Sequence, residues 1–488
     1  MAFASVFRNS IPYFWKFLNP LSFSSSAPPP TTPVSGDNLV CAAVSILKHH
    51  RSKCRWSNLR SLLATTKTTP SQFSAISRQI RNNPQLVLRF FHFTLRHSLS
   101  SHSLTSYATV IHILSRSRLK SEALDVIKSA LCAFSEAQQV TPLAILEALM
   151  KSYRTCGSAP FVFDLLVVAC LEAKKIDLAI EIYSTLKLKN VLLRTNTCNS
   201  LIELVSKSRG CFAGYDLYRE IFYVDAENLD RNGRCSVGFS PNANTLNVVM
   251  VGFYREGLMD KVEELWKEFE RVGCVPNVYS FNVLMAAYCD DGKMEDAMRL
   301  WREIDDQGLQ HDTVSYNAII GGFCRFGEVS KAEEIYREMV MKGLESTCLT
   351  FEHLINGYCI VGDPDSAMLV YKDMHRKNFS PDSLTVNAMV RLLCEKNEIS
   401  TAIGFWKMVV KNDRVSMEKE NYASMIRGLC GKGMMEEALE LQAEMAVRGF
   451  EPDLVIYSSF IDGYVKEGNG IMAGKLREEM HCRQTSEE

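Results

Sequence analysis

A tandem repeat of about 35 residues is the feature that most restricts how this chain can fold. Copies of one pattern begin at residues 160, 195, 243, 278, 313, 348, 383, 419 and 454, and a looser copy begins near 104. The successive intervals from 160 onward are 35, 48, 35, 35, 35, 35, 36 and 35 residues. A constant period of this length is typical of solenoids, in which each unit packs only on its neighbours.

Each copy predicts a pair of helices, and the unit that begins at Val278 shows the pattern clearly. The segment VYSFNVLMAAYC predicts a first helix with Ser280 as its N-cap, and the residues Asp290 to Gly292 end it. A second helix is expected from about Met294 to Asp306, because its apolar residues fall on one stripe. Gly308 then ends this second helix, because glycine tolerates the positive φ that is common just after a helix.

The other copies repeat the same residue types at the same positions. Glycine recurs in the turn between the helices, at 257, 292, 327, 362, 433 and 468, and alanine recurs in the second helix, at 297, 332, 367, 402, 438 and 473. A bulky aromatic position holds Trp266, Trp301, Tyr336, Tyr371 and Trp406. Cys289, Cys324, Cys359, Cys394 and Cys430 also recur, and we interpret them as buried packing residues, as we do the aromatics. One hairpin cannot bury enough apolar surface alone, so the sequence predicts an all-α solenoid of stacked helix-turn-helix hairpins.

Four segments are expected along the chain. Residues 1–36 are predicted to be an organelle transit peptide, and residues 37–103 a basic N-terminal helical region of unclear register. Residues 104–159 would hold a degenerate repeat and an extra helix from Pro142 to Tyr153. Residues 160–488 would form nine repeats, in which thirteen additional residues of the second unit lie in a loop near 228–238.

The charge is distributed unevenly. The whole chain has 55 basic and 56 acidic residues, but residues 1–121 contain fifteen Lys or Arg and only one acid, Asp37. The remainder therefore carries 40 basic and 55 acidic residues. This excludes a uniformly positive nucleic-acid surface over the repeats, so any RNA contact there must be confined to one face.

The first residues have the composition of a targeting signal. No acid precedes Asp37, and Arg8 and Lys16 lie among apolar residues ahead of a Ser-rich stretch that ends at Pro28. This composition predicts import into a mitochondrion, with a chloroplast as the alternative. The apolar stretch near Ile11 is too short for a membrane span, so no membrane partner is expected.

No catalytic, metal-binding or cofactor-binding motif is found. The sequence lacks C-x-x-C pairs and the G-x-x-x-x-G-K-[ST] loop, and the His49–His50 pair has no acidic or Cys companions at ligand spacing. We therefore expect neither an enzyme nor a cofactor.

The repeat itself resembles a known family. The segment DTVSYNAIIGGFCRFGEVSKAEEIYREMVMKGL, from Asp312 to Leu344, is similar to the pentatricopeptide repeat, and its uniform spacing is similar to the P-type subclass of plant organellar proteins. Tetratricopeptide repeats have a similar period, but no unit shows their W-x-x-L-G-x-x-Y start. The resemblance implies a right-handed superhelix that binds single-stranded RNA, one base per repeat.

The resemblance also implies which residues contact the bases. These are the fifth and last residues of each unit, paired as Asn199 with Asn242, Asn247 with Asn277, Asn282 with Asp312, Asn317 with Thr347, Glu352 with Asp382, Asn387 with Glu418, Ala423 with Asp453, and Ser458 with Glu488. The second residues, Tyr279, Val314, Leu349, Leu384 and Val455, would flank the bases. The first three pairs imply cytosine or uracil at two positions and uracil opposite Asn282, whereas the pairs of Glu352, Ala423, Thr347 and Glu418 match no common combination.

Two classes of function remain open. The first is a sequence-selective factor for single-stranded, pyrimidine-biased organellar RNA, acting as a monomer with other RNA-processing proteins in transcript stabilisation, processing, splicing or translation. The second is a protein-binding scaffold within an organellar ribonucleoprotein such as the ribosome. The recurrent Asn at the fifth position favours the first, and the acidic repeat region favours the second.

Overall fold

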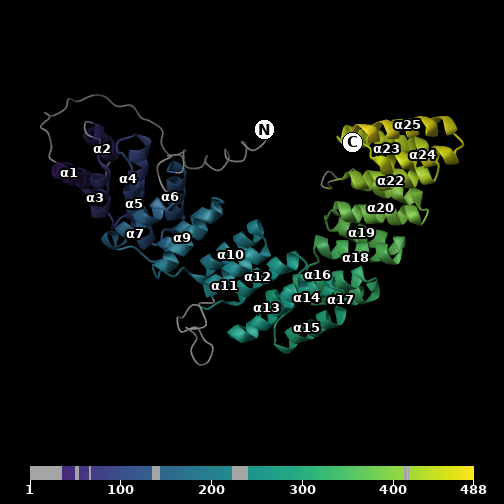
Figure 1. The fold of residues 1–488 in the computed structure, drawn as a ribbon, viewed down its shortest axis with the longest axis horizontal. Coiled ribbons are helices and arrows are strands. Elements are labelled where there is room, and N and C mark those ends of the chain that lie inside the picture. Colours follow the sequence, from purple (N-terminus) through teal and green to yellow (C-terminus); the bar gives the residue numbers. More distant parts are fainter. Residues whose placement is uncertain are drawn as a thin grey trace. The chain divides into compact units, whose positions relative to one another are not determined.

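The computed structural model describes residues 36–49, 54–64, 67–134, 143–222, 240–410, 415 and 417–487. Within these residues every regular element is an α-helix, and one isolated bridge joins Thr68 and Ser100 (Figure 1). The chain divides into two compact units, residues 1–166 and 167–488. The predicted transit peptide and the predicted loop at 228–238 lie outside the described residues, apart from Gly36.

The N-terminal unit contains seven complete helices in its described part. They are α1 (Gly36–His49), α2 (Arg55–Ala64), α3 (Pro70–Gln79), α4 (Pro84–Arg96), α5 (Leu104–Arg116), α6 (Lys120–Ala133) and α7 (Ala144–Cys156). The helices α1, α3 and α5 begin 34 residues apart, and α1 packs on α3, α3 on α5, and α5 on α7. Helical hairpins with nearly the same period are therefore also present in the described part of residues 37–103, where the helix positions could not be predicted from the sequence. The extra helix expected from Pro142 to Tyr153 is α7.

The helix α8 (Val162–Glu172) contains the boundary between the two units. The C-terminal unit continues with α9 (Ile176–Leu188), α10 (Thr195–Arg209), α11 (Cys211–Phe222), α12 (Ala243–Arg255), α13 (Met259–Val272), α14 (Val278–Asp290), α15 (Met294–Asp306), α16 (Thr313–Arg325), α17 (Val329–Met341), α18 (Cys348–Val361), α19 (Pro364–Arg376), α20 (Ser383–Glu395), α21 (Ile399–Val410), α22 (Lys419–Gly431), α23 (Met435–Val447), α24 (Leu454–Lys466) and α25 (Gly470–Glu487). From α10 onward, every first helix begins at the residue predicted from the repeat.

First helices stack on first helices. The helix α10 packs on α12, α12 on α14, and so on to α24, while each first helix also packs on the second helix of its own hairpin. Gly292 and Gly308 adopt φ values of 79° and 68°, in the left-handed region that glycine favours, as the repeat predicted. This arrangement puts equivalent residues of successive first helices next to one another.

The N-cap of α14 differs from the prediction. Asn277, not Ser280, is the N-cap of α14, and its Oδ1 accepts a hydrogen bond from the backbone N–H of Ser280 at 3.0 Å. Ser280 is the third helical residue, and its hydroxyl accepts a hydrogen bond from the backbone N–H of Asn277 at 3.1 Å. This reciprocal pair is a capping box, and it satisfies two amides that the helix leaves free. The last residue of one repeat is therefore the N-cap of the next.

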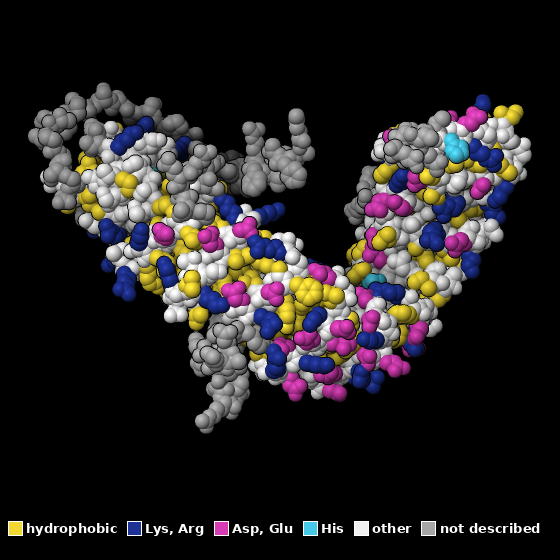
Figure 2. Space-filling model, in the orientation of Figure 1, with side chains coloured by type: hydrophobic (Ala, Val, Ile, Leu, Met, Phe, Trp, Pro, Cys, Tyr) yellow, Lys and Arg dark blue, Asp and Glu magenta, His cyan; other side chains and the backbone are white. Residues whose placement is uncertain are grey.

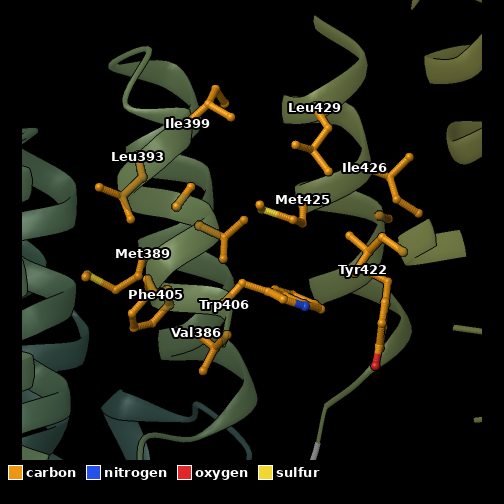
Figure 3. Close-up of a cluster of buried hydrophobic side chains, with 14 of the residues drawn as sticks. Val386, Met389, Leu393, Ile399, Phe405, Trp406, Tyr422, Met425, Ile426 and Leu429 are labelled. Carbon is orange, nitrogen blue, oxygen red and sulfur yellow. The ribbon is translucent and has the colours of Figure 1, made fainter. Parts of the chain in front are cut away.

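The recurrent alanines and aromatics form the core between hairpins, as predicted. Ala297, Ala332 and Ala402 are fully buried. Figure 3 shows Trp406 of α21 next to Tyr422 of α22, and their ring centroids are 5.0 Å apart in an edge-to-face arrangement. Trp301 and Tyr316 pack in the same way at 4.9 Å. The aromatic positions thus join neighbouring repeats and are not platforms for stacked bases.

The recurrent cysteines lie where first helices cross most closely. Cys289 faces Gly322, Cys324 faces Gly357, and Cys394 faces Gly428 on the next first helix. A Cβ atom added at any of these glycines would lie less than 3.0 Å from the sulfur atom. Burial raises the pKa of Cys289 and Cys324 to about 12, so both stay protonated at neutral pH. The buried packing role predicted from the period is confirmed for Cys289, Cys324 and Cys430, whereas Cys359 and Cys394 are partly exposed.

Candidate nucleic-acid interface

Four consecutive repeats hold their fifth and last residues together through one hydrogen bond. The Nδ2 group of the fifth residue donates to a side-chain oxygen of the last residue, and the donor–acceptor distances are 3.4 Å for Asn199–Asn242, 3.3 Å for Asn247–Asn277, 2.9 Å for Asn282–Asp312 and 3.1 Å for Asn317–Thr347. Each of these pairs was expected from the resemblance to the pentatricopeptide repeat. The structure brings the two members together although 30 or more residues separate them.

Helix capping explains why this geometry repeats. The last residue is fixed as the N-cap of the following first helix, and its oxygen points at the start of that helix. The fifth residue lies one turn into the preceding first helix, which packs beside it. Asp312 Oδ1 consequently accepts from Asn282 Nδ2, from the Ser315 backbone N–H at 2.8 Å and from the Ser315 hydroxyl at 3.0 Å.

The two members of a pair differ in their exposure. The fifth residues are almost completely buried, with exposed fractions of 8% for Asn199, 3% for Asn247, 4% for Asn282 and 6% for Asn317. The last residues Asn242 and Asp312 are exposed, and Asn277 and Thr347 are half-buried. In this structure the last residue therefore presents its polar group to solvent, and the fifth residue lies beneath it and orients it.

The next two predicted pairs depart from this arrangement. In the pair of Glu352 and Asp382, Glu352 Oε1 accepts from the Asp382 backbone N–H at 3.0 Å and not from its side chain. Burial raises the pKa of Glu352, and the charge of Asp382 raises it further. Asn387 Oδ1 accepts from the Ser424 hydroxyl at 2.6 Å, and among the described residues it makes no hydrogen bond to Glu418.

The last two pairs offer no comparable site. Ala423 has no polar side chain to donate to Asp453, which instead caps α24 by accepting from the backbone N–H of Ile456 at 3.0 Å. Ser458 was paired with Glu488, which lies outside the described residues. The uniform arrangement of fifth and last residues is therefore limited to the repeats that begin at 195, 243, 278 and 313.

The second residue of five repeats is an exposed apolar side chain. The exposed fractions are 53% for Tyr279, 57% for Val314, 47% for Leu349, 72% for Leu384 and 41% for Val455. These apolar side chains lie in the first turn of their helices, close in sequence to the polar last residue of the preceding repeat. This combination suits a ligand that has both a flat face and a polar edge. The geometry is thus compatible with the predicted base-flanking role.

A hollow of about 530 Å³ lies beside one of these pairs, between α10, α12 and α14. It is lined by Asn247 and by the second residues Asn244 and Tyr279, together with two basic and two acidic side chains, Lys207, Arg255, Glu203 and Glu256. The Asn247 Oδ1 atom is buried and has no hydrogen-bond partner among the described residues. A buried acceptor without a partner is costly.

The basic residues of this hollow were not among the predicted site residues. Lys207 and Arg255 are both the thirteenth residue of their repeats, so the period could have indicated them. Lys207 pairs with Glu203 at 2.6 Å, whereas Arg255 has no ion-pair partner among the described residues. The thirteenth residue of later repeats is Asp290, Arg325, Ile360, Glu395, Gly431 and Lys466, and Arg325 pairs with Asp290. Four of these eight repeats therefore have a basic residue at this position, including the two that line the hollow.

Other chemistry finds little support in the described part of the chain. No group of three or more His, Cys, Asp or Glu side chains there is placed to hold a metal ion. No helix in the same residues has the length and apolar character needed to cross a bilayer.

Comparison with known families identifies the repeat. A model described as the PPR repeat family matches residues 241–290, 276–313, 311–359 and 348–395, and a model of the PPR repeat matches residues 421–450 and 455–484. A pentatricopeptide repeat-containing protein of Arabidopsis thaliana is 50% identical over 248 residues, which are 50% of this chain and 49% of that protein. The chain therefore contains pentatricopeptide repeats between residues 241 and 484.

Further pentatricopeptide repeat proteins are more distant. A protein of A. thaliana whose name includes "mitochondrial" is 27% identical over 205 residues, 41% of this chain and 29% of its own length. The chain thus spans about half, or less, of the length of these relatives. Among solved structures, the maize pentatricopeptide repeat protein PPR10 is 16% identical, with a TM-score of 0.39 over 91% of this chain and 78% of that one.

Proposed function

We propose that this pentatricopeptide repeat protein binds single-stranded RNA in an organelle, through the first helices of its C-terminal unit. The observation that supports this proposal most strongly is the repeated pair of a buried fifth residue and a solvent-facing last residue. Because this pair recurs with the period of the repeat, the matching ligand is a polymer with one polar group per repeat. Unpaired bases expose such groups, whereas the deep groove of A-form duplex does not offer them to side chains.

The acceptor and donor groups of each pair favour pyrimidines in different ways. The Asp312 carboxylate can only accept, and its Oδ2 atom has no partner among the described residues, so it suits the N3–H donor of uracil. An amide such as Asn277 can also donate, so it suits the N3 acceptor of cytosine as well. The resemblance to other repeats of the family leads to the same assignment.

Location and role are further parts of this proposal. Relatives whose names include "mitochondrial" and the acid-free N-terminal sequence support import into a mitochondrion. A protein that occupies a transcript segment can protect it from nucleases or change its folding. The proposed outcome is therefore stabilisation, processing, splicing or translation of a bound transcript, with the chemistry carried out by other proteins.

The substitution Asp312→Asn tests this proposal with little risk to folding. Asparagine caps helices as well as aspartate does, so the stability should change by less than about 0.5 kcal/mol. The variant repeat gains the pair of side chains found at Asn247 and Asn277. Selection of bound RNA from a random pool should show that one position of the enriched sequence changes from uracil toward cytosine, while its neighbours stay the same.

Asp363→Asn is the matched control. Asp363 caps a second helix, α19, by accepting from the Ser366 backbone N–H at 3.1 Å, and it lies outside the predicted pairs. This variant should select the same RNA as the parent protein. Absence of any enriched RNA from the parent, together with capture of a peptide, would instead favour the scaffold function. Enrichment that is identical for all three proteins would rule out base reading at Asp312.

A further inference from the structure

The N-terminal unit carries an unusual excess of positive charge. From residue 38 to residue 121 the sequence contains thirteen Lys or Arg and no Asp or Glu. The structure folds this segment into helical hairpins, so these charges lie on a packed scaffold. A folded surface with a large excess of basic residues attracts anions.

Part of this charge converges where three neighbouring first helices end. Arg78 and Arg81 lie at the end of α3, Arg116 at the end of α5, and α7 ends at Cys156. A Cβ atom at Gly157 would lie 3.4 Å from Nη1 of Arg116, so this guanidinium lies against the end of α7. Burial raises the pKa of the Cys156 thiol, and the charges of Arg78 and Arg81 act against that rise, which places them near the same point.

We name this surface the basic row. It consists of Arg78, Arg81, Arg116, Arg118 and Arg154, all of which are exposed. None of the five forms an ion pair with another described residue, and the described acids of residues 38–166 are only Glu122, Asp125, Glu147 and Asp164. In the C-terminal unit, by contrast, several exposed arginines of the second helices are paired with acids, as in Arg337 with Glu333 at 2.6 Å, although Arg219, Arg302 and Arg477 have no ion-pair partner among the described residues. Figure 2 shows Lys and Arg mixed with Asp and Glu over that unit.

Helix stabilisation explains the basic row only in part. A cation in the last turn interacts favourably with the helix dipole, and Arg78, Arg116 and Arg154 occupy such turns. The helix dipole would stabilise these arginines equally well if acidic residues lay on the neighbouring faces of the unit. It accounts neither for the absence of acids from residues 38–121 nor for the additional Arg81 and Arg118.

We propose that the basic row is a sequence-independent binding site for the phosphate groups of single-stranded RNA. All five residues are arginines, whose planar fork matches phosphate oxygens better than an ammonium group does. The inference rests on the proposed RNA binding by the C-terminal unit, to which it adds affinity without base recognition. An anionic membrane is the weaker candidate, because Leu95 is the one exposed large hydrophobic residue in the described part of 38–166 and interfacial binding needs an apolar face.

The test uses the full chain with Arg78, Arg81 and Arg116 all replaced by Gln. Its affinity for poly(U) is measured between 50 and 200 mM salt. Each phosphate contact to a single strand contributes about 0.7 to the slope of log K against log salt, so losing three contacts should reduce the slope by about 2. The loss of affinity over this salt range should then be about 20-fold smaller than in the parent. The RNA sequence enriched from a random pool should stay the same.

The matched control replaces Arg299, Arg337 and Arg376 by Gln, which changes the net charge equally. Each of these arginines pairs with an acid on its own helix, so the salt slope should not change. Replacing Arg78, Arg81 and Arg116 by Lys keeps their charge and should keep most of the slope. It also separates loss of charge from loss of folding, which circular dichroism monitors in every variant.

Three results would overturn the inference. One is an unchanged salt slope in a folded Gln variant, and another is a loss of sequence preference in that variant. The third is binding of the basic row to phosphatidylserine vesicles but not to poly(U). If the parent shows no enrichment of any RNA sequence yet binds poly(U) through the basic row, the base-reading proposal fails and this one stands. If the parent binds no RNA, both fail.

Discussion

Replacing Gly357 by Ala should separate two first helices that this fold presses together. An alanine Cβ at 357 would lie 2.8 Å from both Cβ and Sγ of Cys324 and 3.2 Å from its Cα. The sulfur can rotate away, but Cβ and Cα are fixed to the backbone of α16. The helices α16 and α18 must therefore move apart, and neighbouring side chains lose contacts as they do.

The expected magnitude follows from two opposing terms. Overpacking of a well-packed core costs about 1 to 3 kcal/mol. Alanine in a helix interior offsets this by about 0.5 to 1 kcal/mol, because glycine loses more backbone entropy on folding. We expect Gly357→Ala to lower the free energy of unfolding by about 1 to 2 kcal/mol, measured by urea denaturation.

Gly404→Ala is the matched control, with the opposite sign. Gly404 is exposed within α21, and nothing lies within 4 Å of the position of its missing Cβ. Only the entropic term operates there, so this variant should gain about 0.5 to 1 kcal/mol. Cys324→Gly should destabilise the Gly357→Ala protein less than it destabilises the parent, which a double-mutant cycle would report as coupling. A Gly357→Ala protein as stable as Gly404→Ala would refute the close-approach argument.

Two further predictions concern ionisable groups. Since burial and Asp382 raise the pKa of Glu352 above its unfolded value, ionising Glu352 costs more in the folded protein, and its contribution to stability falls as pH rises past 4.5. Glu352→Gln should therefore be more stable than the parent at pH 7, and the difference in urea midpoint should shrink toward zero below pH 4; a constant difference would contradict this reasoning. Because burial raises the pKa of Cys289, Cys324 and Cys430 to about 12, these thiols should react with a maleimide only after denaturation, whereas the exposed Cys41 and Cys132 should react in the native protein. Rapid native labelling at Cys324, found by mass spectrometry of peptides, would show that the first helices separate easily.

The predicted site residues show where reasoning from sequence reached its limit. The pairs Asn247–Asn277 and Asn282–Asp312 were identified by position, and the structure joins each of them by a hydrogen bond. The burial of the fifth residue was not foreseen, because a repeat position reveals which residues are equivalent but not how deeply they lie. The role of Ser280 was misassigned for a related reason, since both Asn277 and Ser280 are good capping residues.

The N-terminal unit shows a different limit. Its helices α1, α3 and α5 begin 34 residues apart, yet the segment lacks the Gly turns and aromatic positions that made the later repeats visible. Its positive charge was evident from composition. The packing of three helices brings Arg78, Arg81 and Arg116 together at the end of α7. No feature of the local sequence predicts this arrangement.

The sequence alone determined the helical hairpin, its boundaries and its period, because turn glycines, caps and apolar stripes act over a few residues of chain. It also determined which positions are equivalent from one repeat to the next. Tertiary packing decided which equivalent positions face solvent, which arginines stay unpaired and which glycines meet a cysteine. Those properties depend on the distance between stacked helices, and that distance is set by contacts between residues 30 or more positions apart.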